Sequence, residues 1–368
     1  MISSAVSRRE RGLARERLIW LASVAFCGVL PAVVLVLVFA DALTDGSYAI
    51  DFRPLYRAGE DILAGENPYP LEGDLLTAAG SPFVYPPFPA VLSIPLTVFS
   101  VDAAGFLVMV SLVAAALLIP FVLGVRDWRC YGVLLLWPPV ISAIQTGNVT
   151  LWLALGCALA WRWKDRPAPS SASVGVTLAT KFFLWPLLVW LVAARRAATA
   201  ALALAVGLVL LVASWATIGF DGLRRYPDLL QRLEEVVGDD AYTVFNLMSD
   251  LGAPDAIART LWLGLGFALL AACVVLARSG DERSGLVLAL AAALALTPLV
   301  WLHYFALLSV ACSLARPRLG VVWLVPLAMF VATGSGDPTP LQTVVTLTAA
   351  GVTVALAVRA SRRLVAAT

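Results

Sequence analysis

The strongest constraint on the fold of this chain is a series of long apolar segments without charged residues. The first of them, residues 18–40, has 23 residues and no charge. A helix needs roughly 20 residues, each rising about 1.5 Å, to cross the hydrocarbon core of a bilayer. Only 14% of the residues are charged and the mean hydropathy is +0.89, whereas about a quarter of the residues of a soluble domain are charged. The sequence therefore predicts a protein embedded in a membrane.

The segment before the first apolar run allows two interpretations. Its basic sequence "RRERGLARER" and the small residues Ala40 and Ala42 resemble a cleavable secretory signal peptide. The apolar core of a signal peptide spans roughly 7 to 15 residues, and this run is longer. We therefore favour a retained membrane anchor.

Further apolar segments follow along the whole chain, and short basic connections separate several of them. The apolar segments cover about residues 84–100, 103–124, 131–144, 149–161, 172–194, 197–217, 259–277, 285–301, 304–315, 319–333 and 341–358. The basic connections are the N-terminus and residues 162–167, 194–196, 278–283, 316–318 and 359–363. Since positively charged connections stay in the cytoplasm, the long polar connections 41–83 and 218–258 are expected on the outer side. We predict an all-α polytopic protein of the cytoplasmic membrane, one domain over residues 1–368, with about 10–13 transmembrane helices.

Two of the apolar segments are expected to be interrupted. The pair 131–144 and 149–161 is short for two full crossings, and the sequence "QTGN" between them contains a glycine that favours a helix stop. Segment 172–194 has basic flanks at both ends, so either it folds back around Thr180 and Lys181 or one flank breaks the rule. Irregular backbone at membrane depth requires a cavity lined by protein or filled with water.

Both outer loops are expected to contain a helix that lies along the membrane interface. Residues 53–65 show apolar positions at helical spacing, with Pro54 near the start and Gly65 at the end. In the second loop one apolar face is expected to consist of Leu223, Tyr226, Leu230, Leu233 and Val237. Two such helices on one side would roof a groove that opens to the lipid.

Composition and motifs argue against several functions. The net charge is +2 and the basic residues are spread in short clusters, which argues against binding of nucleic acid. The five cysteines lie in or beside apolar runs and are expected to be small core residues. No zinc spacing, phosphate-binding glycine loop, catalytic serine pattern or nucleotide fingerprint occurs. We expect no metal and no cofactor, and the polar residues that do occur suit a substrate that is itself a membrane lipid phosphate.

Asp51 is the first candidate for chemistry. It follows the first apolar segment by about ten residues, which places it near the outer membrane surface, where a partly desolvated carboxylate can act as a general base. The structural alternative is that Asp51 caps the helix expected near Pro54.

Lys181 and His303 are the next candidates. A lysine deep in a span costs on the order of 2.5 to 3.5 kcal/mol on insertion scales, so Lys181 is expected to face a cavity or an anion such as a phosphate; the alternative is snorkelling to the interface. His303 is the only histidine and lies between aromatic residues near the expected interface. It is either a packed hydrogen-bonding residue or a catalytic one.

The amides of Gln145 and Asn148 lie at the expected helix break. An unpaired polar group in apolar surroundings costs roughly 1 to 3 kcal/mol. Both side chains must therefore bond to backbone or to a ligand.

Together these residues resemble glycosyltransferase family 87, the polyprenyl-phosphate-mannose-dependent α-1,2-mannosyltransferases with the type C membrane fold. The resemblance rests on Asp51 and Phe52 at the start of the first outer loop, then "AGEDILAGENPY", "FVYPPFPAVLSIPL" and "QTGN". It continues with Lys181 in a broken helix, Asn246 and Ser249 after the second outer loop, and "WLHY" at residues 301–304.

The resemblance implies an inverting transfer at the outer face of the membrane. The donor would be a polyprenyl-phosphate-linked sugar, the acceptor a glycolipid or lipid-linked glycan, and the general base Asp51. His303 would assist catalysis. The donor phosphate would be bound by Lys181, Arg53 and Arg57. The sugars would be bound by Tyr85, Gln145, Asn148, Asn246, Trp301 and Tyr304.

Three alternatives compete with this interpretation. A related type C enzyme would use glucose or arabinofuranose on the lipid phosphate in place of mannose. A transporter or flippase would place charges near the midplane and show paired broken helices in two similar halves, but no internal repeat is evident in this sequence. A purely structural membrane protein would leave the cost of Lys181 unexplained.

Overall fold

The computed structural model describes residues 15–45, 48–69, 82–333 and 337–365, and these residues form helices without a strand. The first half of the chain contains η1 (Ala25–Val29), α2 (Leu30–Asp45), α3 (Arg53–Ala64), α4 (Pro87–Ser93), η2 (Ile94–Val98), α5 (Val101–Val122), α6 (Trp128–Leu135), α7 (Pro138–Thr146), α8 (Thr150–Arg162), α9 (Pro167–Thr180) and η3 (Phe182–Leu184). The second half contains α10 (Pro186–Ala193), α11 (Ala197–Thr217), α12 (Tyr226–Val237), η4 (Gly238–Asp240), α13 (Val244–Asp250), α14 (Asp255–Arg278), α15 (Glu282–Leu296), η5 (Leu302–Leu307), α16 (Leu308–Ala315), α17 (Val321–Leu324), η6 (Val325–Ala332) and α18 (Pro340–Val365). The protein is thus all-helical, as the apolar pattern predicts.

Fewer continuous helices cross the membrane than the sequence predicts. In the described part of the chain, 5 helices are long and apolar enough to span, or up to 6 if the bent pair α7 and α8 counts as one span. The spanning helices cover Arg15–Thr44, Val101–Val122, Ala197–Thr217, Asp255–Arg278 and Pro340–Arg362. Other apolar segments form shorter helices, at Pro87–Val98, Phe182–Ala193, Leu302–Ala315 and Val321–Ala332. The sequence predicts about 10–13 crossings. Some of the predicted segments form short or broken helices instead, because prolines and turns interrupt the apolar runs.

The two expected interruptions are present. α7 and α8 meet at an angle of 117°, and Gly147 ends α7 with a left-handed backbone (φ 69°), which glycine adopts without steric cost. α9 ends at Lys181, whose backbone is extended, before η3 and α10 continue the segment. Both breaks therefore place a polar residue at an irregular stretch of backbone.

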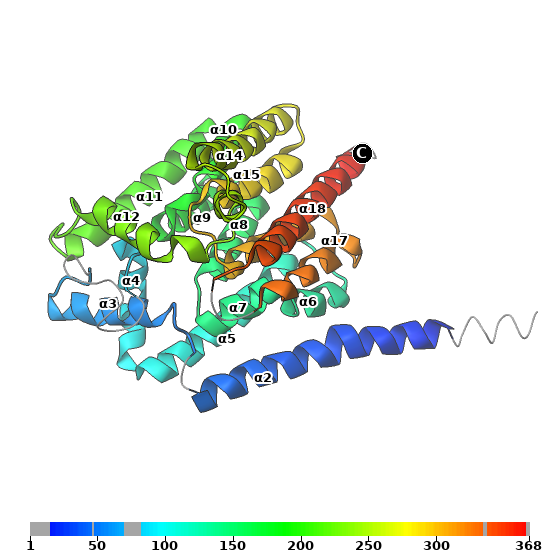
Figure 1. Ribbon diagram of the computed structural model, residues 1–368, viewed down its shortest axis with the longest axis horizontal. Helices are drawn as coiled ribbons and strands as arrows, with labels where there is room; N and C mark the ends of the chain where they lie inside the picture. The colour runs from blue at the N-terminus through cyan, green and yellow to red at the C-terminus, as the bar shows by residue number, and fades with distance from the viewer. Residues whose placement is uncertain (1–14, 46–47, 70–81, 334–336, 366–368) are drawn as a thin grey trace, which may run out of the picture.

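The two expected loop helices are α3 and α12, and Figure 1 shows them at one end of the bundle. α3 begins beside Pro54 and ends at Gly65 (φ 76°), as predicted. The buried face of α12 differs from the prediction, because Leu229 and Leu233 are buried whereas Leu230 is exposed. Neighbouring segments decide that face, since the hydroxyl of Tyr226 reaches the carbonyl of Val84 (2.9 Å).

Three of the predicted cytoplasmic connections meet at the opposite end of the bundle. Glu282 accepts hydrogen bonds from Lys164 (2.9 Å) and Arg196 (2.7 Å), and Arg196 also pairs with Asp165 (2.8 Å). We refer to this end as the Glu282 end and to the end with α3 and α12 as the Asp51 end.

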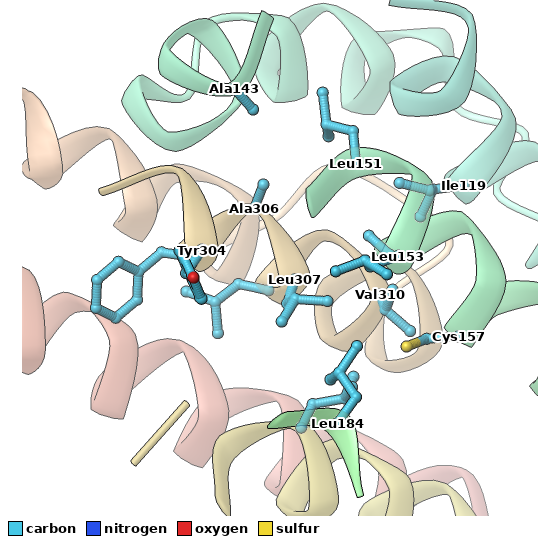
Figure 2. Close-up of a cluster of buried hydrophobic side chains, with 14 of the residues drawn as sticks. Ile119, Ala143, Leu151, Leu153, Cys157, Leu184, Tyr304, Ala306, Leu307 and Val310 are labelled. Carbon is cyan, nitrogen blue, oxygen red and sulfur yellow. The ribbon is translucent and has the colours of Figure 1, made fainter. Parts of the chain in front are cut away.

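A continuous apolar core joins the two ends. Figure 2 shows buried side chains converging from α5, α7, α8, η3, η5 and α16, among them Ile119, Leu153, Leu184 and Leu307. Burying each such side chain stabilises the fold by about 1.5–3 kcal/mol. The same cluster holds Tyr304, the residue after His303, so the core fixes the backbone that carries this part of the candidate site. All five cysteines are buried, as predicted.

Candidate active site

The segment that carries Asp51 is hydrogen-bonded to the end of α7. The backbone N–H of Ala49 donates to the carbonyl of Gln145 (2.8 Å), and that of Asp51 donates to the carbonyl of Thr146 (2.8 Å). Gly147 makes this approach possible, because a Cβ there would lie 3.0 Å from Cβ of Phe52 and 3.1 Å from Cα of Ala49. The helix break therefore positions Asp51 as well as Asn148.

The carboxylate of Asp51 is held by Asn148. The Nδ2 of Asn148 donates to Oδ2 of Asp51 (2.8 Å), and Oδ1 of Asn148 accepts from the backbone N–H and hydroxyl of Thr150 (3.0 and 2.6 Å). These bonds fix which end of the amide faces Asp51. α3 begins at Arg53 and has no side-chain cap, so the alternative role of Asp51 as a helix cap is not the one that the structure shows.

His303 lies beside the same carboxylate oxygen. Its Nδ1 is 4.0 Å from Oδ2 of Asp51, beyond hydrogen-bond distance. The ring packs against Trp301 and Tyr304. It is buried, and its Nε2 has no hydrogen-bond partner among the described residues. A buried imidazole with an unsatisfied nitrogen in a cavity wall is suited to contact a substrate.

The ammonium of Lys181 lies next to two aromatic residues of this site, Tyr85 and Tyr304. Nζ donates to the hydroxyl of Tyr304 (2.6 Å) and lies 4.8 Å from the ring centre of Tyr85 and 4.3 Å from that of Tyr304. Contacts between a cation and aromatic faces stabilise the charge without neutralising it. The positive charge of Lys181 therefore remains available to an anion.

A cavity of about 660 Å³ opens above these residues. Its wall includes the predicted site residues Asp51, Tyr85, Gln145, Trp301 and His303. Other lining residues are not predicted from the sequence, among them Ser142, Thr146, Asp240, Tyr242 and Asp337. No sequence pattern indicates the last three, which come from loops far from Asp51 in the chain.

Asp240 and Asp337 form a pair of carboxyl groups in the cavity wall. A hydrogen bond with Asp337, partial burial and the nearby carboxylates of Asp337 and Asp239 raise the pKa of Asp240 to about 6. Asp240 therefore holds its proton more tightly than an ordinary aspartate does at mildly acidic pH.

Six predicted residues do not line this cavity. Asn148, Lys181 and Tyr304 contact residues that do, namely Asp51, Tyr85 and His303, and the other three are Asn246, Arg53 and Arg57. Both Nδ2 hydrogens of Asn246 are directed to backbone, with the carbonyls of Gly238 (2.6 Å) and Ala241 (3.0 Å) as acceptors. Arg53 pairs with Asp102 (2.8 Å). Arg57 is exposed on α3. The structure thus gathers the predicted residues of the helix breaks and of "WLHY", but not Asn246 or the two arginines.

An apolar groove of about 550 Å³ adjoins the cavity. α4, η2, α8 and α9 form its walls, for example through Leu92, Leu96, Trp152 and Val176. Its lining also includes Phe52, Val149 and Thr180, the direct neighbours of Asp51, Asn148 and Lys181. An isoprenoid or acyl chain in this groove would therefore end beside the polar site.

Fold and site together define a polytopic membrane protein with a polar cavity next to an apolar groove. Comparison with known proteins agrees with this class. The chain belongs to glycosyltransferase family 87, whose sequence profile matches residues 83–279.

One characterised relative is similar over most of the chain. It is a polyprenol-phosphate-mannose-dependent alpha-(1-2)-phosphatidylinositol pentamannoside mannosyltransferase of Mycolicibacterium smegmatis, 26% identical over 278 residues. The match covers 69% of this chain and 62% of the relative's own length. No solved structure matches this chain.

Proposed function

We propose that this protein transfers a mannosyl residue from a polyprenyl-phosphate donor to a lipid-linked glycan acceptor, with inversion at the anomeric carbon. The observation that carries the proposal is the position of Asp51. This residue lines a polar cavity, is oriented by Asn148, and directly precedes Phe52 in the lining of the apolar groove. The mannose is inferred from family 87 and from the donor in the relative's name. The type C membrane fold is part of the same proposal.

Asp51 acts as the general base. A carboxylate oxygen of Asp51 takes the proton of one acceptor hydroxyl. At the same time, the oxygen of that hydroxyl attacks the anomeric carbon of the donor sugar. The bond between this carbon and the phosphate oxygen breaks, and the polyprenyl phosphate leaves with the electron pair. Attack from the face opposite the phosphate inverts the configuration, so no covalent sugar intermediate is needed.

Lys181 stabilises the leaving phosphate. Charge on the phosphate oxygens grows as the glycosidic bond breaks, and a fixed cation close to that charge lowers the barrier. Lys181 directly follows Thr180 in the groove lining and contacts Tyr85 in the cavity wall. It therefore lies where a chain in the groove and a sugar in the cavity would be joined by a phosphate.

His303 lines the cavity, and its buried Nε2 has no hydrogen-bond partner among the described residues. In the neutral ring one nitrogen donates and the other accepts a hydrogen bond, so this atom can contact a phosphate oxygen or a sugar hydroxyl. Gln145, Tyr85 and Trp301 supply the amide and aromatic surfaces that sugars need. Arg53, Arg57 and Asn246 do not line the cavity in this state and are left out of the chemical step.

The site lies at the outer face of the cytoplasmic membrane. The basic connections gather at the Glu282 end, and such connections remain in the cytoplasm. The Asp51 end is then outside, where a lipid-linked donor presents its sugar.

The test is transfer by the purified protein in nanodiscs. Labelled polyprenyl-phosphate mannose, glucose and arabinofuranose are offered separately with a mannosylated glycolipid acceptor, and the anomeric configuration of the product is determined. We expect transfer of mannose with inversion, and a kcat about 10²–10⁴-fold lower for Asp51→Asn.

Asp228→Asn is the matched control, because Asp228 is an exposed carboxylate on α12, and it should transfer like the wild type. Retained configuration, or wild-type rates in Asp51→Asn, would contradict the mechanism. Preference for another lipid-phosphate sugar would correct the donor and leave the reaction class intact.

A further inference from the structure

A second groove meets the cavity at the end of α7. It has a volume of about 480 Å³ and lies between α2 and Gln145 at the end of α7. The side chain of Gln145 belongs to both this groove and the cavity that contains Asp51. The two spaces therefore adjoin at a single residue, and this residue is hydrogen-bonded through its carbonyl to the segment of Asp51.

The lining of the α2 groove changes from apolar to polar along the helix. Val34, Leu37 and Val38 line its deeper part, and Asp41 and Thr44 line the part nearer the Asp51 end. Leu37 is 62% exposed, so the groove is open along its length to the surrounding lipid. Figure 1 shows α2 at the edge of the bundle, which leaves this side accessible from the membrane.

The charge of the lining distinguishes this groove from the one beside Lys181. Neither groove has a basic residue among its described lining residues, but Asp41 contributes a carboxylate at the polar end of the α2 groove. Lys181, by contrast, directly follows Thr180 in the lining of the other groove. A carboxylate repels a phosphate monoester but accepts hydrogen bonds from sugar hydroxyls. The donor phosphate is therefore matched by the groove next to Lys181, and a headgroup rich in hydroxyls is matched by the α2 groove.

We propose that the α2 groove binds the acyl chains of the acceptor glycolipid and admits its sugars to the cavity past Gln145. The inference rests on the proposed transfer reaction. The acceptor hydroxyl must reach Asp51 from the face opposite the donor phosphate, and the two grooves have separate walls. α2 and Gln145 form the walls of one groove, and α4, η2, α8 and α9 form the walls of the other. Each lipid thus has its own access from the membrane.

The test compares transfer to two acceptors in each of two variants. Ala40→Trp fills the groove with a large ring at an exposed lining position, and Ala32→Trp makes the same change at an exposed position of α2 outside the lining. Each variant receives labelled polyprenyl-phosphate mannose with either a diacyl-anchored mannoside or a water-soluble mannoside. We expect the ratio of lipid-anchored to soluble transfer to fall at least about tenfold in Ala40→Trp and to stay unchanged in Ala32→Trp.

Other outcomes would overturn the proposal in distinguishable ways. An unchanged ratio in Ala40→Trp would show that the acceptor does not use the groove, and equal loss with both acceptors would assign the groove to the donor. A wild type that transfers mannose to neither acceptor would overturn the proposed function itself.

Labelling of an introduced cysteine tests the same proposal without depending on the folding of the tryptophan variant. Ala40→Cys is purified as an active protein and then treated with a bulky maleimide, and Ala32→Cys is the control. The native cysteines are all buried and should react slowly. Labelling of Ala40→Cys should lower the acceptor ratio by the same factor, whereas an unchanged ratio after full labelling would contradict the proposal.

Discussion

At the Glu282 end of the bundle, one carboxylate accepts hydrogen bonds from Lys164 and Arg196 at 2.9 and 2.7 Å, and all three side chains are mostly buried. At the Asp51 end, the carboxylate of Asp51 has one neutral amide partner at 2.8 Å and a histidine at 4.0 Å, and it faces a cavity. The same kinds of residue are thus paired at one end and left accessible at the other.

This difference separates two uses of charge in an apolar chain. Paired charges at the Glu282 end tie three connections together, so their removal should affect stability. At the Asp51 end the unsatisfied Nε2 of His303 and the ammonium of Lys181 over two aromatic rings gain little for the fold. Their removal should affect transfer, because we propose that their missing partner is the substrate.

The largest contrast is expected from the two lysines of the chain. Lys181→Gln should lower kcat by about 10²–10³-fold, because in the proposed mechanism it removes the cation that stabilises the leaving phosphate. Lys164→Gln makes the same change at the Glu282 end and should lower the unfolding temperature while kcat stays close to that of the wild type. Steady-state transfer and thermal unfolding in nanodiscs measure both. Equal kinetic losses in the two variants would remove the distinction between the ends.

A smaller kinetic effect is expected from Asn148. Asn148→Ala removes the hydrogen bond that orients Asp51, and misplacement of a catalytic group can cost up to about 10²-fold. We expect kcat to fall by about tenfold to hundredfold with little change in KM. Thr150→Val should show a weaker loss, and Thr150→Ser, which keeps the hydroxyl that fixes Asn148, should restore the rate. A rise in KM alone would assign Asn148 to binding.

At the Glu282 end the expected effect is on stability. Glu282→Gln weakens the hydrogen bonds from Lys164 and Arg196, and a hydrogen bond to a charged group contributes about 1.5–3 kcal/mol. We expect the unfolding temperature to drop by several degrees and transfer at low temperature to remain. Thermal unfolding followed by tryptophan fluorescence provides the measurement, with the exposed variant Asp228→Asn as the control.

The smallest effect is expected from the carboxyl pair at the Asp51 end. The pKa of Asp240 is raised to about 6 by its hydrogen bond with Asp337, by burial and by neighbouring carboxylates. A raised pKa means that the folded state binds the proton more tightly, so this contribution to stability is present at low pH and is lost as the pH rises through about 6.

Asp240→Asn keeps a hydrogen-bond donor and removes the repulsion. Its unfolding temperature should therefore exceed that of the wild type by a few degrees at pH 7.5, and the difference should vanish towards pH 4. Parallel curves for the two proteins between these pH values would show that the pKa of Asp240 is not raised in the folded state.

The breaks in the helices could be predicted from the sequence because single residues cause them. Gly147 permits a left-handed turn, and burying the charge of Lys181 in the middle of an apolar helix costs free energy. Both residues therefore indicate a helix break in the sequence. The same reasoning identified α3 and α12 from their amphipathic pattern, although the buried face of α12 is set by contacts with other segments and was assigned incorrectly at Leu229 and Leu230.

The assembly of the site could be predicted only in part. Asp51 and Asn148 are 97 residues apart, and they meet because the backbone of Asp51 pairs with the end of α7, which no local pattern encodes. Asp240 and Asp337 resemble ordinary carboxylates of polar loops, so nothing in the sequence marks them as cavity residues. Conversely, the arginines of α3 stand close to Asp51 in sequence, but the helix directs Arg53 to Asp102.

The most direct test of the difference between the two ends is a paired measurement on Asp51→Asn and Glu282→Gln. Transfer rate and unfolding temperature are determined for both variants in the same nanodisc preparation. We predict that Asp51→Asn loses at least about 10²-fold in kcat and unfolds like the wild type, whereas Glu282→Gln unfolds at a lower temperature and transfers like the wild type. An active Asp51→Asn, or one that loses activity only because it unfolds, would contradict the account.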